Sequence, residues 1–129
     1  MSNQKTILIV DDDIDLLEQT SVVVGGAGYK IVTADSEKTA MEILETNVPD
    51  LAIFDLMMEN MDSGFILSRK LKEIDEKVPV IIVTAVTSET GLHFETDGAN
   101  KKSWIKADAI IDKGIRYEQL LSKISDLLN

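Results

Sequence analysis

Short apolar runs alternate along the chain with segments whose apolar residues recur at helical spacing. The runs are rich in apolar and β-branched residues at successive positions, which is typical of strands covered on both faces of a sheet. Five such runs lie at residues 5–10, 29–34, 51–54, 78–83 and 107–112. Because such strands need helices on both faces, the alternation predicts an α/β domain, a doubly wound parallel sheet with right-handed crossovers.

The segments between the runs predict amphipathic helices. Their apolar residues lie three and four positions apart, and the helices are expected at residues 14–27, 37–46, 65–76 and 117–128. Asp13 can cap the first helix, and Asp35 or Ser36 the second, because their side-chain oxygens can accept from the first turn. Residues 86–107 lack sustained periodicity, so we expect a long loop there with one short helix near residues 101–106.

Length and composition fit a single globular domain. At 129 residues the chain can bury roughly two thirds of its unfolded surface, so residues 1–129 are expected to form one domain. The absence of cysteine excludes disulfides, thiolate nucleophiles and cysteine metal sites, and it fits a reducing compartment. The N-terminus lacks the apolar segment of a signal peptide, and no run approaches the roughly eighteen apolar residues of a membrane span. We therefore expect a cytoplasmic protein.

The chain is strongly acidic, with a formal net charge of -10. Non-specific binding to DNA, RNA or an anionic membrane depends on clustered Lys and Arg that displace counterions. We therefore expect no direct nucleic-acid partner and no membrane partner.

Groups suited to metal and phosphate chemistry follow the predicted strands. Asp11 and Asp12 follow the first, Asp55 the third, Thr84 the fourth and Lys113 the fifth. The carboxyl ends of parallel strands share one edge, where three carboxylates would repel by roughly 4 kcal/mol per pair at ~4 Å and so need a cation. Oxygen-only ligands favour Mg2+ or Mn2+. Asp55 could then act as a nucleophile on phosphorus, while Thr84 and Lys113 hold the phosphoryl oxygens.

Four spaced motifs carry a family resemblance. They are Ile-Val-Asp-Asp at residues 9–12, Pro-Asp-Leu-x-x-x-Asp at residues 49–55, Val-Thr-Ala at residues 83–85 and Asp-Lys at residues 112–113. Together they resemble the receiver domain of two-component response regulators, of the chemotaxis-regulator type, over essentially the whole chain. The resemblance implies a flavodoxin-like fold with a five-stranded sheet in the order 2-1-3-4-5.

The resemblance also implies roles for the acids. Asp55 is similar to the phosphoacceptor of the family. The implied ligands of the Mg2+ or Mn2+ ion are Asp11, Asp12, Asp55 and the backbone carbonyl of Met57.

Two further roles and the partners follow from the same resemblance. Thr84 corresponds to the switch hydroxyl and Lys113 to the phosphate-binding lysine, and with Asp55 they form the catalytic set. The phosphoryl donor would be a phosphohistidine on a sensor histidine kinase or a histidine phosphotransfer protein of a phosphorelay, and a downstream protein of unknown identity would receive the signal. A homodimer stays open. Such a module is no enzyme in the usual sense, because it catalyses only its own phosphorylation and dephosphorylation.

The chain departs from the family pattern at several places. Receivers usually have Met-Pro-x-Met-Asp-Gly after the acceptor, whereas residues 58–64 are Met-Glu-Asn-Met-Asp-Ser-Gly, without the proline and with one more residue before the glycine. Gly114 stands where proline usually follows the lysine, and Ile110 stands where an aromatic switch residue is usual. All five core side chains of the family pattern are present, so the acceptor chemistry is expected to be intact, whereas these departures are expected to alter how the signal is transmitted.

Two alternatives stay open at the level of sequence. Asp11-x-Asp13 after an apolar strand also resembles the nucleophile motif of haloacid dehalogenase-type phosphatases, with Thr84 and Lys113 as later phosphate-binding residues. At 129 residues the chain is short for that family and lacks its cap domain and distal paired acids. The other alternative is a pseudo-receiver that signals without phosphorylation.

Overall fold

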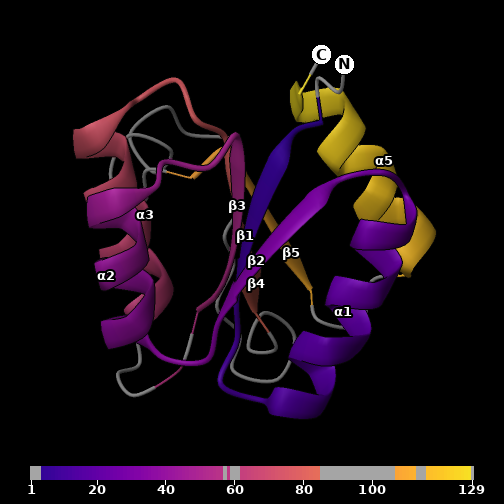
Figure 1. Ribbon diagram of the computed structural model, residues 1–129, viewed down its shortest axis with the longest axis horizontal. Helices are drawn as coiled ribbons and strands as arrows, with labels where there is room; N and C mark the ends of the chain where they lie inside the picture. The colour runs from indigo at the N-terminus through magenta and orange to yellow at the C-terminus, as the bar shows by residue number, and fades with distance from the viewer. Residues whose placement is uncertain (1–3, 57, 59–61, 85–106, 113–115, 129) are drawn as a thin grey trace.

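The computed structural model describes residues 4–56, 58, 62–84, 107–112 and 116–128. Within them one parallel sheet has the strand order β2-β1-β3-β4-β5, which confirms the predicted order (Figure 1). The strands are β1 (Thr6–Val10), β2 (Lys30–Ala34), β3 (Leu51–Asp55), β4 (Val80–Thr84) and β5 (Ala109–Asp112). The expected loop and short helix of residues 86–107 fall almost entirely outside the described residues.

Helices cover both faces of the sheet. They are α1 (Ile14–Gly26), α2 (Glu37–Thr46), α3 (Ser63–Ile74) and α5 (Tyr117–Leu128). Helices α2 and α3 pack on one face and α1 and α5 on the other, as Figure 1 shows. None of these described helices is both long enough and apolar enough to cross a membrane.

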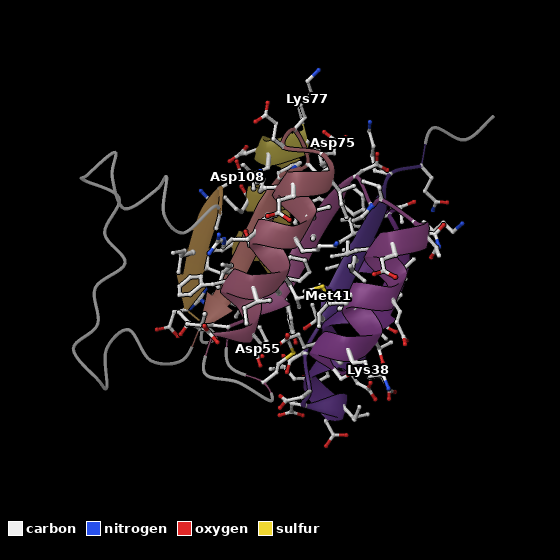
Figure 2. All side chains as sticks on the ribbon, turned by 90° about the vertical axis from the view of Figure 1, so that its left-hand side faces the viewer. Lys38, Met41, Asp55, Asp75, Lys77 and Asp108 are labelled. Atoms are coloured by element: carbon white, nitrogen blue, oxygen red, sulfur yellow. The ribbon has the colours of Figure 1, made fainter. Side chains whose placement is uncertain are left out.

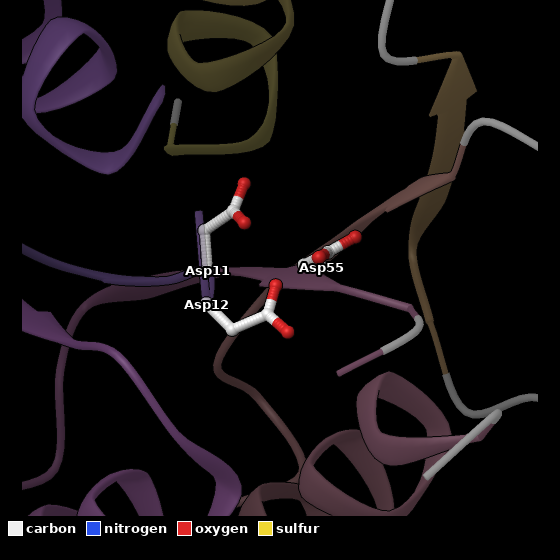
Figure 3. A group of neighbouring side chains, drawn as sticks. All are labelled: Asp11, Asp12 and Asp55. Carbon is white, nitrogen blue, oxygen red and sulfur yellow. The ribbon is translucent and has the colours of Figure 1, made fainter. Parts of the chain in front are cut away.

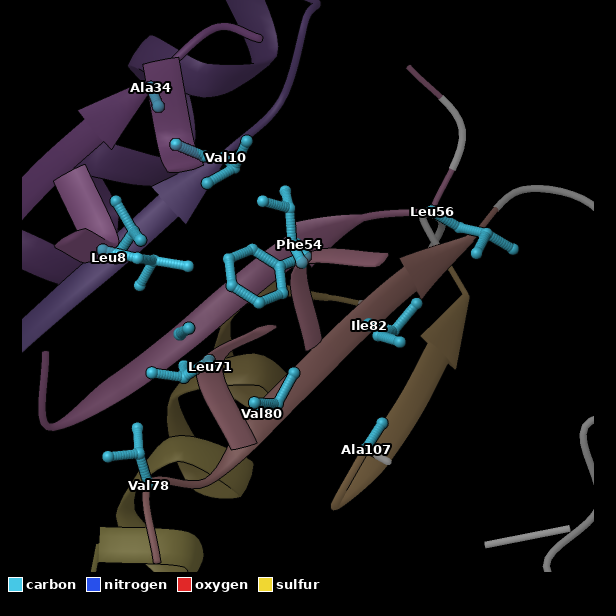
Figure 4. Packing of buried hydrophobic residues seen from close by; sticks show 14 residues of the cluster. Leu8, Val10, Ala34, Phe54, Leu56, Leu71, Val78, Val80, Ile82 and Ala107 are labelled. Atoms are coloured by element: carbon cyan, nitrogen blue, oxygen red, sulfur yellow. The ribbon is translucent and has the colours of Figure 1, made fainter. Parts of the chain in front are cut away.

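Side chains of successive strand residues alternate between the two faces, which creates two cores. One core lies between the sheet and helices α2 and α3, and it contains the fully buried Phe54 (Figure 4). The other contains Ile7, Ile9 and Ile53 and packs against α1 and α5. All five residues of β3 are buried, which explains why the third run is apolar at successive positions.

Side-chain caps fix where the first two helices begin. Asp13 Oδ1 accepts a hydrogen bond from Leu16 N at 3.2 Å, as expected. Of the two candidates for the second helix, Ser36 is the cap, since its Oγ accepts from Thr39 N at 3.1 Å. These caps satisfy backbone donors that the helices themselves leave unpaired.

A charged cluster joins β4 and β5 at the amino edge of the sheet, and nothing in the sequence indicated it. Lys72 Nζ donates to Asp108 Oδ2 at 2.8 Å and to the Val78 carbonyl at 2.7 Å. The same Asp108 oxygen accepts from Val80 N at 2.8 Å. Asp108 lies at the opposite end of the sheet from Asp55 (Figure 2). The cluster therefore fixes where β5 begins beside β4, far from the acidic edge.

Candidate functional site

Three carboxylates meet at the carboxyl edge of the sheet, as the sequence predicted. Asp11 and Asp12 directly follow β1, and Asp55 is the last residue of β3. Val10 of β1 pairs with Phe54 of β3, so the two strands end side by side. One oxygen from each of the three carboxylates lies within 4.8 Å of the other two (Figure 3).

The three acids differ in exposure and in how they are held. Asp55 is 4% exposed and Asp11 is 8% exposed, whereas Asp12 is exposed. Asp11 Oδ1 accepts from Asp13 N at 2.9 Å, and Asp11 N donates to the Ala34 carbonyl at 3.2 Å. These bonds tie the end of β1 both to the start of α1 and to the end of β2. Within the acidic run after β1, Asp13 therefore caps α1, whereas Asp11 holds the turn between β1 and α1.

The electrostatics of this cluster favour a bound cation. At 4.8 Å and an effective dielectric constant near 20, each pair of charges repels by roughly 3.5 kcal/mol. Burial of Asp11 and Asp55 limits the water that could screen this repulsion. Carboxylate oxygens are the ligands of hard divalent ions such as Mg2+ and Mn2+. The acidic triad can therefore hold such an ion.

Thr84 lies on the same edge of the sheet as Asp55. It is the last residue of β4 and is 1% exposed. In the register, Asp55 pairs with Val83, and Thr84 pairs with Asp112, the last residue of β5. Two other expected members of the site, Met57 and Lys113, fall outside the described residues.

The backbone after Asp55 is in close contact with the start of α3. Gly64 N donates to the Leu56 carbonyl at 2.9 Å. A Cβ atom on Gly64 would lie 2.8 Å from Leu56 Cα and 2.9 Å from the Asp55 carbonyl oxygen. Only glycine allows α3 to lie this close to the backbone of Asp55 and Leu56. The one sequence signal for this contact was the displaced glycine of the 58–64 motif.

A small cavity adjoins Asp11 and Asp55 on the α1 and α5 side of the sheet. Its volume is about 60 Å³, and apolar side chains such as Leu16 and Tyr117 line most of it. Pockets for small-molecule ligands usually have volumes of about 300–1,000 Å³. This cavity is therefore too small for a nucleotide or a sugar phosphate.

Comparison with known proteins identifies the class. The model of the response regulator receiver domain family matches residues 7–125. Phosphate regulon transcriptional regulatory protein PhoB of Pseudomonas aeruginosa is 31% identical over 126 residues, which are 96% of this chain and 52% of that protein. Heme response regulator HssR of Staphylococcus saprophyticus is 44% identical over 80 residues, 62% of this chain and 35% of that protein. The chain thus spans about half or less of the length of these relatives.

Solved structures agree with the family match. A CheY-like response regulator receiver domain protein from Methanospirillum hungatei JF-1 superposes with a TM-score of 0.82 at 28% identity, covering 98% of this chain and 94% of that one. Response regulator TrrA from Thermotoga maritima, in complex with Mg2+-BeF, superposes with a TM-score of 0.78 at 26% identity, covering 97% and 100%. The fold is the flavodoxin-like fold that the sequence resemblance implied.

The chain belongs to the response regulator receiver domain family of two-component signalling. It is a phospho-accepting receiver with an acidic pocket formed by Asp11, Asp12 and Asp55, and hence a signalling module rather than a conventional enzyme. Receiver domains accept phosphoryl groups from histidine kinases. The family match supports the receiver over the haloacid dehalogenase alternative.

Proposed function

We propose that Asp55 is the phosphoacceptor and that transfer requires a Mg2+ or Mn2+ ion held by Asp11, Asp12 and Asp55. The convergence of three carboxylates within 4.8 Å carries this proposal. Asp55 is the member that ends a fully buried strand, so its backbone is fixed. The Mg2+-BeF complex of TrrA supports the choice of metal, because a fluoride complex of beryllium resembles a phosphoryl group on a carboxylate.

Transfer would be a nucleophilic displacement at phosphorus. An Asp55 carboxylate oxygen forms a bond to phosphorus while the bond from phosphorus to the donor's histidine nitrogen breaks. The electron pair of the broken bond stays on the imidazole, which takes up a proton. A bound ion would offset the negative charge on the acceptor and phosphoryl oxygens. The product is an acyl phosphate on Asp55.

Three further residues belong to this proposal. The Thr84 hydroxyl would donate to a phosphoryl oxygen, and its place at the shared strand edge supports that role. Lys113 would hold a second oxygen, which is supported by its position directly after Asp112, the partner of Thr84 in the register. The backbone carbonyl of Met57 would complete the metal site, because it follows Asp55 by two residues.

The biological setting is proposed by the class of each partner. The donor would be a sensor histidine kinase or a histidine phosphotransfer protein, and the signal would pass to a downstream protein. Residues 1–129 would act as one receiver domain in the cytoplasm. Membership of the receiver family supports this setting.

Chemical trapping tests the acceptor. The protein is incubated with acetyl phosphate and Mg2+, quenched in acid and mapped by peptide mass spectrometry. We expect the phosphoryl group on the peptide that contains Asp55. A phosphoryl group on the Asp11 peptide would instead support the phosphatase alternative. A protein that is not phosphorylated and does not bind beryllofluoride would support the pseudo-receiver.

Mg2+ is expected to stabilise the folded protein through the same site. At a free concentration one hundred times the dissociation constant, a ligand that binds only the folded state adds about 2.7 kcal/mol to the free energy of unfolding. Urea unfolding with EDTA and with Mg2+ measures this gain, which should be smaller in Asp12→Asn. Asp126→Asn, an exposed change on α5, is the matched control. An equal gain in all three proteins would place the ion elsewhere.

A further inference from the structure

A partly buried hydrogen bond joins the first turns of α2 and α3. The Ser63 hydroxyl donates to Glu37 Oε1 at 2.8 Å, across 26 positions of sequence. Ser63 is 0% exposed, and Glu37 is half-buried in the first turn of α2. The residue before α3, Asp62, makes no side-chain cap bond. The Ser63 side chain therefore bonds to a neighbouring helix at the point where α3 begins.

Glu37 also suits this place electrostatically. Its carboxylate lies in the first turn of its own helix and within a hydrogen bond of the first residue of α3. The amino ends of both helices carry partial positive charge, which a carboxylate stabilises. One side chain thus favours the start of two helices at the position where they meet.

From Ser63 the contacts continue directly to the acceptor. The next residue, Gly64, donates its backbone N–H to the Leu56 carbonyl at 2.9 Å. Its Cα approaches so closely that an added Cβ would lie 2.9 Å from the Asp55 carbonyl oxygen. The start of α3 and the backbone that carries Asp55 are therefore in direct contact, so a shift of one is expected to disturb the other.

On the other side, the contacts lead back to the first acidic residues. Asp11 N donates to the carbonyl of Ala34, the last residue of β2, at 3.2 Å. Helix α2 begins with Glu37, three positions after Ala34. The first turn of α2 is thus connected through Ala34 to Asp11, and through Ser63 and Gly64 to the backbone of Asp55.

We propose that Glu37 and Ser63 are positioning residues that hold the two sides of the acidic site at the separation the metal requires; this rests on the proposed function of Asp55. Neither residue touches the reacting atoms. Their hydrogen bond holds α3 against α2. The close contacts of Gly64 with Leu56 and Asp55 then hold the backbone of Asp55 in place. The residue directly before the displaced glycine of the 58–64 motif, Ser63, supplies the hydroxyl.

Loss of the hydrogen bond should weaken metal binding and acceptor chemistry together. The hydrogen bond to the Glu37 carboxylate is stronger than one between neutral groups, so its loss can change an equilibrium constant by about tenfold. Because part of the energy of this bond is lost as local relaxation, we expect Ser63→Ala and Glu37→Ala each to raise the Mg2+ dissociation constant about fivefold. Phosphorylation by acetyl phosphate at subsaturating Mg2+ should slow by a similar factor, and hydrogen exchange at the Gly64 amide should accelerate.

Conservative and double variants separate positioning from simple stabilisation. In Glu37→Gln the amide oxygen can still accept from Ser63 but without the negative charge, so a Mg2+ dissociation constant between those of the wild type and Glu37→Ala is expected. The double variant Ser63→Ala with Glu37→Ala should be little worse than either single variant, because both remove the same bond. The matched controls are Ser21→Ala, a helical serine on α1, and Glu45→Ala, an exposed glutamate on α2. Both controls should keep wild-type Mg2+ affinity.

The readouts distinguish this proposal from the function on which it rests. Mg2+ affinity and Gly64 exchange are measured by amide NMR on unphosphorylated protein, and the unfolding midpoint is recorded for every variant. Lower stability with unchanged Mg2+ affinity and unchanged Gly64 exchange in Ser63→Ala and Glu37→Ala would overturn the positioning role, as would a Glu37→Gln variant as defective as Glu37→Ala. Failure of the wild-type protein to accept a phosphoryl group would overturn the function of Asp55 instead.

Discussion

Asparagine in place of Asp55 is expected to abolish phosphorylation and to stabilise the metal-free protein. The amide oxygen is too weak a nucleophile to form the acyl phosphate, so no phosphoryl group should be gained from acetyl phosphate. The change also removes one of three carboxylates whose oxygens lie within 4.8 Å. The gain in free energy of unfolding should be about 1–3 kcal/mol, a value reduced from the Coulomb energy because Asp12 is exposed to screening water.

Two measurements check this variant. Intact mass after incubation with acetyl phosphate and Mg2+ reports the acceptor, and urea unfolding in EDTA reports the stability. The stability advantage should shrink when Mg2+ is added, because the ion stabilises the wild-type cluster more than the variant. A phosphorylated Asp55→Asn protein, or one less stable than wild type in EDTA, would contradict the account.

Alanine in place of Gly64 should be the most damaging small substitution near the site. Its Cβ would lie 2.8 Å from Leu56 Cα and 2.9 Å from the Asp55 carbonyl oxygen, both backbone atoms that cannot rotate away. Such overpacking usually costs about 1–3 kcal/mol, and a value near 3 kcal/mol is expected because the backbone itself must shift. Since the shift would move Asp55, the rate of phosphorylation should fall as well.

Gly26→Ala offers a matched control for this substitution. Gly26 is exposed at the end of α1, and a Cβ there would meet nothing within 4 Å. Alanine favours a helix over glycine by up to about 1 kcal/mol, so this variant should equal or exceed the wild-type stability. Urea unfolding of both variants gives the comparison. If Gly64→Ala were as stable as Gly26→Ala, the close approach of α3 to the acceptor loop would be wrong.

The apolar runs of the sequence predicted where the strands lie, but the ends of the runs follow the burial of side chains rather than the pairing of the backbone. The fourth apolar run was expected at residues 78–83, and β4 is Val80–Thr84. Val78 is 6% exposed, yet it precedes Pro79, which has no N–H to donate to a neighbouring strand. The fifth run behaves alike, since Ala107 is buried but β5 begins at Ala109. Apolar side chains just outside a strand pack into the same core, so hydrophobicity alone could not set these boundaries.

The acidic cluster was predictable because it depends on strand ends, whereas its supports depend on how helices meet. Parallel strands bring their carboxyl ends to one edge, and the strand order implied by the family resemblance places the first and third strands side by side, so Asp11, Asp12 and Asp55 were expected to be neighbours. The bond between Ser63 and Glu37 requires the relative position of two helices, which no local pattern encodes.

The residue that replaces the usual aromatic switch is visible on β5. Ile110 is partly buried and packs against the core that contains Phe54, on the α2 and α3 side of the sheet. An aliphatic residue here makes no hydrogen bond of the kind a tyrosine could. The roles of Lys113 and Met57 remain predictions from sequence, because both lie outside the described residues.

A crystal structure of the protein with Mg2+ and beryllofluoride would show directly whether Asp55 is the acceptor beside the metal. We expect beryllium bonded to an Asp55 carboxylate oxygen, with the metal about 2.1 Å from carboxylate oxygens of Asp55 and of the pair Asp11 and Asp12. Thr84 should donate to a fluoride. Beryllofluoride on Asp11 with Asp55 unmodified, or a metal bound away from the three carboxylates, would contradict it.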